Sequence, residues 1–183
     1  MILGAVADDL TGATDLGLTL ARGGMDVVEV LGVPDGPLPE ADAVVVALKS
    51  RTIPADDAVA MSLSSVDALA GAGARHVVFK VCSTFDSTDA GNIGPVTDAL
   101  ADRLGAGLVP VSPAFPTNRR TVYRGHLFVG DDLLSDSPMR DHPLTPMRDA
   151  SLVRVLSRQS RRRIGLVPYE TVARGAAAIL DAF

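Results

Sequence analysis

The chain opens with Ile2-Leu3-Gly4-Ala5-Val6-Ala7, a short apolar run that passes directly into Asp8-Asp9-Leu10-Thr11-Gly12-Ala13-Thr14-Asp15. The apolar run predicts a buried strand, and the acidic and hydroxyl residues behind it predict a helix start. We expect that helix to span residues 10–22 and to end at Gly23-Gly24. Such a junction places carboxylates and free backbone N–H groups at the rim of a sheet, where open α/β sheets bind ligands.

The rest of the chain repeats this alternation of apolar runs and helical patterns. We expect strands at residues 26–33, 43–48, 76–81, 108–111 and 164–167, and helices at residues 54–72, 92–104, 149–159 and 169–181. The run at 43–48 is apolar throughout, which is typical of a parallel strand buried on both faces. Strands that alternate with helices predict a three-layer α/β/α fold with a mainly parallel sheet.

One long segment interrupts the alternation. Residues 113–147 contain five prolines and a single β-like stretch, at residues 121–129. Connections of about 35 residues are uncommon in compact domains and are usually functional, unless they hide an unrecognised element. We therefore expect a long Pro-rich excursion from the sheet.

Composition limits the classes of function. With 183 residues, of which 47% are hydrophobic, the chain fits one globular domain with a buried core. Its net charge of −5 argues against a nucleic-acid surface. No apolar run has the length of a membrane span, and the N-terminus lacks the basic region of a signal peptide. Together with the single cysteine, these features predict a soluble, cytoplasmic protein without disulfides.

The histidines and the cysteine give no sign of a metal site. His76, His126 and His142 lie on different predicted elements and lack metal-ligand spacing. Cys82 has apolar neighbours, and nothing in the sequence marks it as an activated thiolate. We expect no bound metal, and we expect Cys82 to serve packing.

Charged residues follow three of the predicted strands. Asp8-Asp9 follow the first, Lys49-Ser50-Arg51 follow the run at 43–48, and Lys80 lies near the end of the run at 76–81. Since the carboxyl ends of parallel strands share one edge, we expect these side chains to line one cleft. Cations there suit a carboxylate ligand, and acids suit sugar hydroxyls. Taken singly, the acids could be ordinary helix caps and the lysine an ordinary solvated strand end.

The segment at residues 80–95 is the densest polar stretch beside a predicted strand. Its hydroxyl, carboxyl and amide side chains precede a helix; they are Ser83, Thr84, Asp86, Ser87, Thr88 and Asn92. Gly91 and Gly94 allow a close approach of the backbone. Such a loop can bind a polyol or a carboxylate, although a long capping loop would have the same composition.

Five motifs resemble a known family in the same order along the chain. They lie at residues 7–13, 80–95, 113–116, 125–129 and 139–147. Together they closely resemble the four-carbon acid sugar kinase family, whose members include kinases of 3-oxo-tetronate, D-threonate and D-erythronate. The resemblance extends over residues 1 to about 156.

This resemblance implies a two-domain enzyme in which an N-terminal domain binds the sugar acid and a C-terminal domain binds ATP. Residues 1–183 would then form the N-terminal substrate-binding domain, which we expect to be truncated, with the C-terminal nucleotide-binding domain absent. The chain contains no glycine-rich loop of the P-loop pattern. We therefore expect ATP and Mg²⁺ to bind through the absent domain, and this chain alone to be inactive.

The implied reaction is the ATP-dependent phosphorylation of a hydroxyl of a four-carbon sugar acid. Asp8 or Asp9 is our candidate for orienting or deprotonating that hydroxyl. We assign the substrate carboxylate to Ser50, Arg51 and Lys80. The remaining candidates would bind the substrate hydroxyls; they are Ser83, Asp86, Ser87 and Asn92.

The sequence is also compatible with other classes of protein. The main alternative is a stand-alone sugar-acid-binding module without catalysis. A receiver-type signalling domain is disfavoured, because Lys49-Ser50-Arg51 occupies the place of its phosphate-accepting aspartate. A phosphatase with an Asp-x-Asp nucleophile is disfavoured because Asp8 and Asp9 are adjacent. We expect a sugar acid and the C-terminal domain as partners, with no nucleic acid or membrane, and the sequence leaves open a homodimer.

One position departs from the family pattern. Arg119-Arg120 follow Asn118, where the resemblance predicts a glycine and one arginine. A bulky residue in a turn can change the geometry of the loop or its contact with an anion. The departure therefore bears on substrate identity more than on fold.

Overall fold

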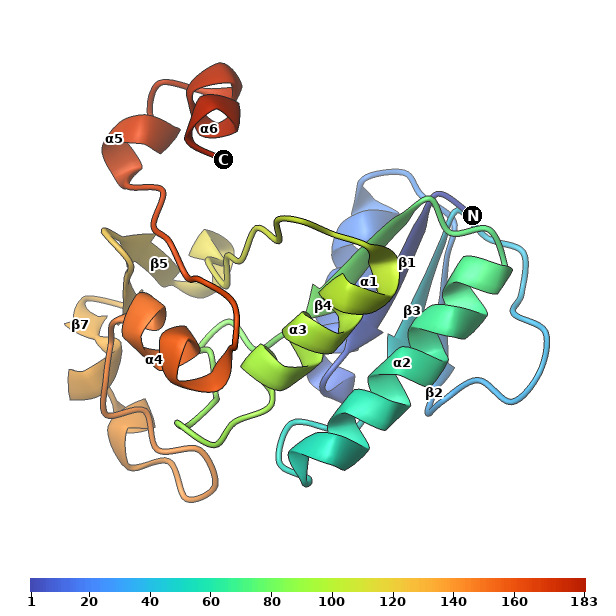
Figure 1. Ribbon diagram of the computed structural model, residues 1–183, viewed down its shortest axis with the longest axis horizontal. Coiled ribbons are helices and arrows are strands. Elements are labelled where there is room, and N and C mark those ends of the chain that lie inside the picture. The colour runs from blue at the N-terminus through green and yellow to red at the C-terminus, as the bar shows by residue number, and fades with distance from the viewer.

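A four-stranded parallel sheet forms the centre of the computed structural model, which describes all 183 residues (Figure 1). Its strands are β1 (Leu3–Ala7), β2 (Val27–Leu31), β3 (Ala43–Ala47) and β4 (His76–Lys80), in the order β2-β3-β1-β4. In the register of the sheet, Ala7 of β1 lies beside Ala47 of β3 and beside Lys80 of β4. The carboxyl ends of three strands therefore meet at one edge, as the sequence predicts.

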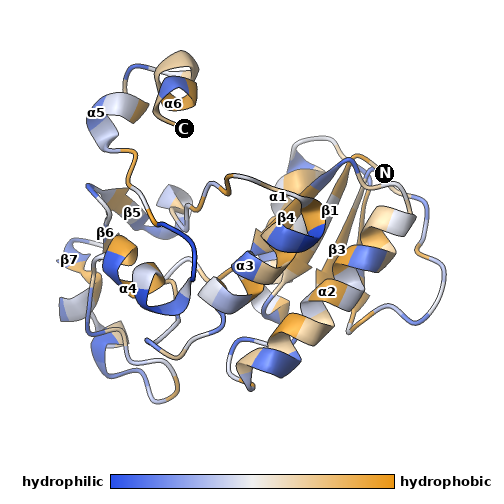
Figure 2. Ribbon diagram, in the orientation of Figure 1, coloured by the Kyte–Doolittle hydropathy of each residue, from blue (hydrophilic) through white to orange (hydrophobic).

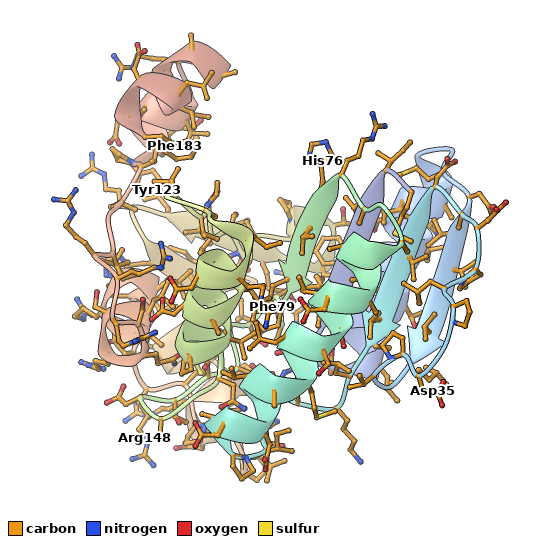
Figure 3. The ribbon with its side chains drawn as sticks, turned by 45° about the vertical axis from the view of Figure 1, so that its right-hand side comes forward. Asp35, His76, Phe79, Tyr123, Arg148 and Phe183 are labelled. Carbon is orange, nitrogen blue, oxygen red and sulfur yellow. The ribbon has the colours of Figure 1, made fainter.

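Helices cover both faces of the sheet, which confirms the predicted three layers. On one face, the even-numbered Val6 and Val44 pack with α2 (Ala55–Gly71) and α3 (Ile93–Leu104). On the other face, the odd-numbered neighbours in β1 and β3 pack with α1 (Leu10–Arg22). Because side chains of a strand alternate between faces, only apolar strands can be buried on both, and Figure 2 shows β1 and β3 in the hydrophobic colour. Phe79 of β4 points toward α2 and α3 (Figure 3).

A second, smaller region has its own antiparallel sheet. It contains β5 (Arg120–Tyr123), β6 (His126–Val129) and β7 (Asp132–Leu133), followed by α4 (Leu152–Gln159). Three short 3₁₀ turns, at Pro116–Asn118, Leu134–Asp136 and Pro138–Asp141, complete it. Its core is separate from that of the parallel sheet and consists of Phe85, Ile93, Leu127, Leu134, Met147, Ala150, Val155 and Leu156.

The predicted β segment at 121–129 is a hairpin rather than one stretch. Arg124 and Gly125 form its two-residue turn with φ of 48° and 74°. Positive φ at both central residues matches the twist of the flanking strands, as in type I′ turns. Arg119 also has a positive φ, of 57°, so it occupies the left-handed region that favours glycine, and its guanidinium contacts exposed Asp131.

Three sequence predictions are wrong. Residues 108–111 and 164–167 form no strand, so the parallel sheet has four strands and β4 is an edge. An apolar run specifies an extended backbone, but a strand also needs a hydrogen-bonding neighbour. The expected helix at 169–181 is two short helices, α5 (Tyr169–Val172) and α6 (Ala176–Ala182), because Gly175 has a φ of 91°.

The C-terminal helices stand apart from the sheet (Figure 1). No residue of α6 is buried. The contact of this segment with the second region is made by α5, where the ring centroid of Tyr169 lies 5.8 Å from that of Tyr123 in β5. None of the helices combines the length and apolar character needed to cross a membrane.

Candidate functional site

Backbone hydrogen bonds join the three strand ends. The Asp8 N–H donates to the Lys80 carbonyl (3.1 Å), and the Ser50 N–H donates to the Asp8 carbonyl (3.0 Å). These bonds continue the parallel ladders one residue beyond the strands. The structure thereby brings together segments that lie about 40 and 70 residues apart in the sequence, as the edge argument predicts.

Arg51 lies at the centre of the resulting charge cluster. Its guanidinium binds Asp8 in a bidentate manner, with Nε–Oδ2 at 3.1 Å and Nη2–Oδ1 at 2.9 Å. Nη2 also lies 2.9 Å from Oδ2 of Asp9, and Nη1 lies 3.5 Å from Oδ2 of Asp86. Three predicted site acids therefore surround one predicted site cation, and the planar guanidinium fixes their relative positions.

For both Asp8 and Arg51, burial and the neighbouring charges shift the pKa in opposite directions. Burial raises the pKa of Asp8 above its usual value, although the hydrogen bonds from Arg51 oppose the shift. Burial also disfavours the charge of Arg51, but its hydrogen bonds to Asp8 together with the surrounding negative charges outweigh that effect and raise its pKa. Arg51 therefore stays charged, and Asp8 is a buried partner that removal of Arg51 would leave uncompensated.

Asp9 is both a helix cap and a member of the cluster. Its Oδ1 accepts a hydrogen bond from the Gly12 N–H (2.8 Å), as an N-cap residue does. Its side chain is 29% exposed, whereas that of Asp8 is 6% exposed. The cap reading therefore holds for Asp9, which is also the more accessible acid of the pair.

Gly12 permits the close packing around this cap. A Cβ on Gly12 would lie 2.6 Å from Oδ1 of Asp9 and 3.3 Å from Nζ of Lys80. Any side chain there would displace the carboxylate, the ammonium group, or both. The Lys80 ammonium donates one hydrogen bond, to the Val81 carbonyl (2.7 Å), and retains two N–H groups for a ligand.

The loop after β4 is held by a buried, strained residue. Phe85 has a φ of 55° and is fully buried in the core of the second region. Its neighbours face the cluster: the Thr84 hydroxyl donates to Oδ1 of Asp86 at 2.6 Å. Backbone strain in a non-glycine residue persists only where the surrounding packing enforces it. The second region therefore fixes the part of the loop that presents Asp86.

Cys82 lies beside this loop as a packing residue. Its Sγ lies 3.0 Å from the Thr84 hydroxyl. Burial raises the pKa of the thiol, and the charge of Asp86 raises it further. A thiol with a raised pKa is a poor nucleophile at neutral pH, which agrees with the expected packing role.

Three predicted contact residues do not join the charge cluster. The Asn92 amide hydrogen-bonds to backbone carbonyls of the turn after β3. The Ser87 hydroxyl accepts a hydrogen bond from Nε2 of Gln159 (2.9 Å). Ser83 lines a groove of about 610 Å³ beside the edge strand β4, which Lys80 also lines. The loop thus contributes Asp86 to the charge cluster, while Ser87 and Asn92 make structural connections.

Gln159 is a structural partner of the predicted loop that the sequence does not reveal. Besides contacting Ser87, its Oε1 accepts a hydrogen bond from the Gly94 N–H (2.9 Å). A Cβ on Gly94 would lie 2.4 Å from Cβ of Gln159. The only signal in the sequence is the glycine itself, which marks a close approach without naming the partner.

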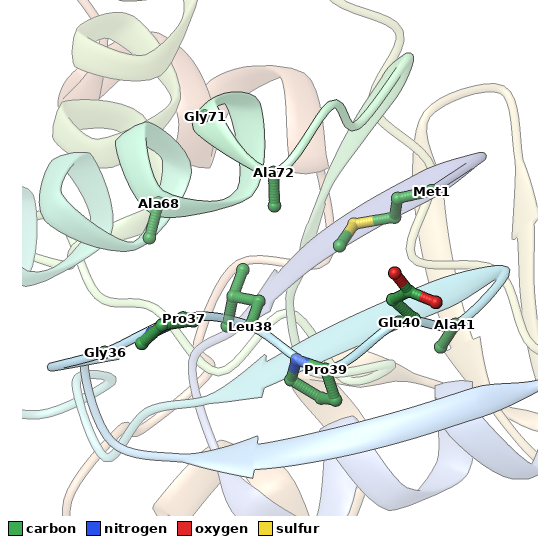
Figure 4. Close-up of a pocket in the computed structure, with 10 residues that line it drawn as sticks. All are labelled: Met1, Gly36, Pro37, Leu38, Pro39, Glu40, Ala41, Ala68, Gly71 and Ala72. Atoms are coloured by element: carbon green, nitrogen blue, oxygen red, sulfur yellow. The ribbon is translucent and has the colours of Figure 1, made fainter.

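A second cavity lies away from all of these groups. It has a volume of about 660 Å³ and is bounded by Met1, the segment 36–41 and the end of α2 (Figure 4). Glu40 is its one charged lining residue. No group of three or more His, Cys, Asp or Glu side chains is arranged to hold a metal ion. The cluster around Arg51 is therefore the candidate site.

Comparisons with known proteins show which family the chain resembles. The model of a family described as the sugar-binding N-terminal domain matches residues 3–183. A 3-oxo-tetronate kinase of Burkholderia multivorans is 60% identical over 97% of this chain, which spans 42% of that protein. The chain therefore spans less than half the length of this curated relative.

Solved structures show the same fold. The crystal structure of a Haemophilus influenzae protein matches with a TM-score of 0.96 and 46% identity, over 98% of this chain and 44% of that one. A Bordetella bronchiseptica protein, crystallised with bound citrate as a domain-swapped dimer, matches with a TM-score of 0.70 and 31% identity. That match covers 86% of this chain and 40% of the Bordetella chain.

Proposed function

The chain belongs to the family of sugar-binding N-terminal domains, and from this membership we propose that it is the sugar-acid-binding part of an ATP-dependent kinase. The kinase would phosphorylate a hydroxyl of a four-carbon sugar acid. The 60% identity to a 3-oxo-tetronate kinase supports this substrate class. Because ATP is the phosphoryl donor, the same proposal places the protein in the cytoplasm.

The observation that carries the proposal is the charge cluster at the carboxyl edge of the sheet. Asp8, Asp9 and Asp86 meet Arg51 there, and Lys80 lies beside them. A sugar acid carries one carboxylate and several hydroxyls, so it needs cations and hydrogen-bond acceptors within a few ångströms of each other. Citrate, which a relative at 31% identity bound in its crystals, is also an anionic hydroxy acid.

We assign different roles to the two cations. Lys80 is the proposed carboxylate ligand, because it retains two free N–H groups. The donors of Arg51 are directed at three aspartates, so its proposed role is to hold those acids and to add positive charge to the pocket. Ser50 and Ser83, which flank the two strand ends, remain proposed hydrogen-bonding partners of the ligand.

Asp9 is the proposed catalytic residue of the acid pair. It is the more exposed of the two, and its Oδ2 contacts Arg51 at 2.9 Å, so its charge is stabilised without being buried. In this position it can accept a hydrogen bond from a substrate hydroxyl and orient that oxygen for attack. Asp8, which Arg51 binds with both oxygens, holds Arg51 in place.

ATP and Mg²⁺ do not fit the residues of this chain. It has neither a glycine-rich phosphate loop nor a cluster of metal ligands. We therefore assign both to the part of the longer relatives that this chain does not span. The chain's own contribution is to bind the acid, orient its hydroxyl and fix the surrounding charges, which is what phosphoryl transfer requires of a protein.

Asp9→Asn in the full-length kinase tests the proposal. We expect turnover of a four-carbon sugar acid to fall by about 10²–10⁴-fold while the affinity for that acid changes little, because the amide keeps its shape but loses its basicity. Asp67→Asn, at an exposed ion pair on α2, is the matched control and should leave turnover unchanged. Unchanged turnover in Asp9→Asn would remove the catalytic role.

A complementation assay separates the kinase from a stand-alone binding module. The 183-residue chain is assayed with and without the separately produced remainder of a full-length relative. Activity that appears only in the mixture supports the kinase, and sugar-acid binding with no activity in the mixture supports the module. A thermal-shift panel of D-threonate, D-erythronate and 3-oxo-tetronate would identify the preferred acid.

A further inference from the structure

One buried amide connects two loops of the charge cluster. Nδ2 of Asn92 lies 2.8 Å from the Ser50 carbonyl, 3.2 Å from the Arg51 carbonyl and 2.9 Å from the Ile53 carbonyl. Asn92 precedes α3, whereas the three carbonyls belong to the turn after β3. The contacts therefore bridge segments about 40 residues apart in the sequence.

These contacts use the donor capacity of the amide. A side-chain amide has two N–H groups, and here they serve three carbonyl oxygens. The residue is also only 7% exposed. Asn92 is therefore placed to hold the turn, and its N–H groups are not free to reach a substrate hydroxyl.

The turn that Asn92 holds is the one that carries Arg51. Two of the three carbonyls, those of Ser50 and Arg51 itself, flank the Arg51 Cα. From this fixed backbone the guanidinium reaches Asp8, Asp9 and Asp86. A shift of the turn would change all of these contacts together, because one rigid planar group makes them.

The same two loops are joined a second time at the cluster. Asp86 lies on the loop that leads to Asn92, and its Oδ2 is 3.5 Å from Nη1 of Arg51. The turn after β3 and the loop after β4 are thus linked by Asn92 at one point and by Arg51 at another. The Asn92 contact involves backbone carbonyls, so it acts on the position of the turn whatever side chains the turn carries.

We propose that Asn92 is a positioning residue that sets the affinity for the sugar acid by fixing the backbone of Arg51. This inference rests on the proposed function, in which the Arg51 cluster binds that acid. It differs from direct recognition, in which Asn92 would touch the ligand. It also differs from general stabilisation, in which any equally destabilising substitution would have the same effect on affinity.

The test is a double-substitution cycle on the full-length kinase, with D-threonate, D-erythronate and 3-oxo-tetronate as calorimetric probes. We expect Asn92→Ala to weaken binding of the preferred acid by about 10–100-fold, the range produced by small misplacements of binding groups. Arg51→Lys keeps the charge but lacks the fork that binds three acids. In that background, Asn92→Ala should weaken binding by less than about twofold, since coupled residues are not additive.

Two further variants keep the result interpretable. Val66→Ala destabilises the core beneath α2, away from the cluster, and should leave the affinity within about twofold of the wild type. If Asn92→Ala does not fold, Asn92→Ser replaces it in the experiment, because serine retains one hydrogen-bond donor. We expect its loss of affinity to lie between those of the wild type and Asn92→Ala. The NMR signal of the Arg51 Nε–H, which donates to Asp8, gives a readout without ligand and should move in the Asn92 variants but not in Val66→Ala.

The outcomes are distinct. Equal losses from Asn92→Ala in the wild-type and Arg51→Lys backgrounds would indicate direct contact and overturn the inference. An equal loss in Val66→Ala, or no loss in Asn92→Ala, would overturn it as well. If the wild-type kinase binds none of the acids, the proposed function itself fails and the inference fails with it.

Discussion

The parallel-sheet region and the small antiparallel region solve the same packing problem in different ways. The first, residues 3–104, buries rows of alanine and valine between two helical layers. The second, residues 115–159, surrounds larger side chains such as Leu127 and Met147 with a hairpin, 3₁₀ turns and one short helix. In the first region the register of the strands fixes where the side chains at the strand ends lie. In the second region the side chains on turns are fixed only where a hydrophobic core packs against the turn.

The candidate site lies where these two regions meet, and each contributes to it in a different way. The sheet places Asp8, Arg51 and Lys80 through strand ends and backbone ladders. The second core contains Phe85 and Ile93, although both belong to the connection between β4 and α3. The difference shows that the loop carrying Asp86 depends on packing contributed by a segment much later in the chain.

The largest expected effect follows from removing the anchor of that loop. Phe85→Ala should lower the free energy of unfolding by about 3–5 kcal/mol, because the residue is fully buried and its removal leaves a cavity. Urea denaturation measures the loss. Hydrogen exchange should accelerate in β6, which packs on Phe85, far more than in β1. Equal acceleration in both strands would mean that the two regions unfold as one unit.

A smaller effect is expected where α3 meets α4. Gly94→Ala should destabilise the protein by about 1–3 kcal/mol, since the new Cβ would lie 2.4 Å from Cβ and 2.6 Å from the backbone C of Gln159. Gly71→Ala at the end of α2, where no atom lies within 4 Å, is the matched control and should be neutral or stabilising. Thermal unfolding of both variants compares them. Equal stability would show that α4 moves away from α3 at little cost.

A third test concerns the buried carboxylate between the regions. Asp98 of α3 accepts hydrogen bonds from the Ser160 hydroxyl (2.6 Å) and the Arg161 N–H (2.7 Å). Asp98→Asn should cost about 1–3 kcal/mol, because the amide presents a donor to one of these donors. Asp67→Asn, whose ion pair with Arg103 is exposed, should cost about 1 kcal/mol or less. Chemical denaturation measures the free energy of unfolding of both variants. Similar losses of stability would show that the hydrogen bonds of Asp98 add no more stability than an exposed ion pair.

The smallest expected effect is a gain. Arg119 has a φ of 57°, which costs an L-residue about 1–2 kcal/mol and costs glycine almost nothing. Arg119→Gly should stabilise the protein by about 0.5–1 kcal/mol once the greater flexibility of unfolded glycine is counted. Its exposed ion pair with Asp131 contributes little. A measured loss of thermal stability would show that the ion pair outweighs the backbone strain.

The sequence predicts most of the secondary structure of the parallel-sheet region but less of that of the antiparallel region. The strands at 43–48 and 76–81 are within one residue of β3 and β4, because continuous apolar runs specify buried parallel strands. The runs at 108–111 and 164–167 look similar in sequence but have no strand beside them. The hairpin at 120–129 was missed as a hairpin because Arg124, rather than asparagine or glycine, occupies the first left-handed turn position.

For the candidate site, the sequence by itself determined that Asp8, Asp9, Arg51 and Lys80 come to one edge of the sheet, because strands that alternate with helices run parallel and end at the same edge. Only the tertiary structure decided what each one does there. Arg51 is surrounded by three acids and Asn92 by three carbonyls, whereas Lys80 keeps free donors. The reason is physical: a polar group is available to a ligand only after its neighbours in space have taken their hydrogen bonds, and those neighbours lie far away in the sequence.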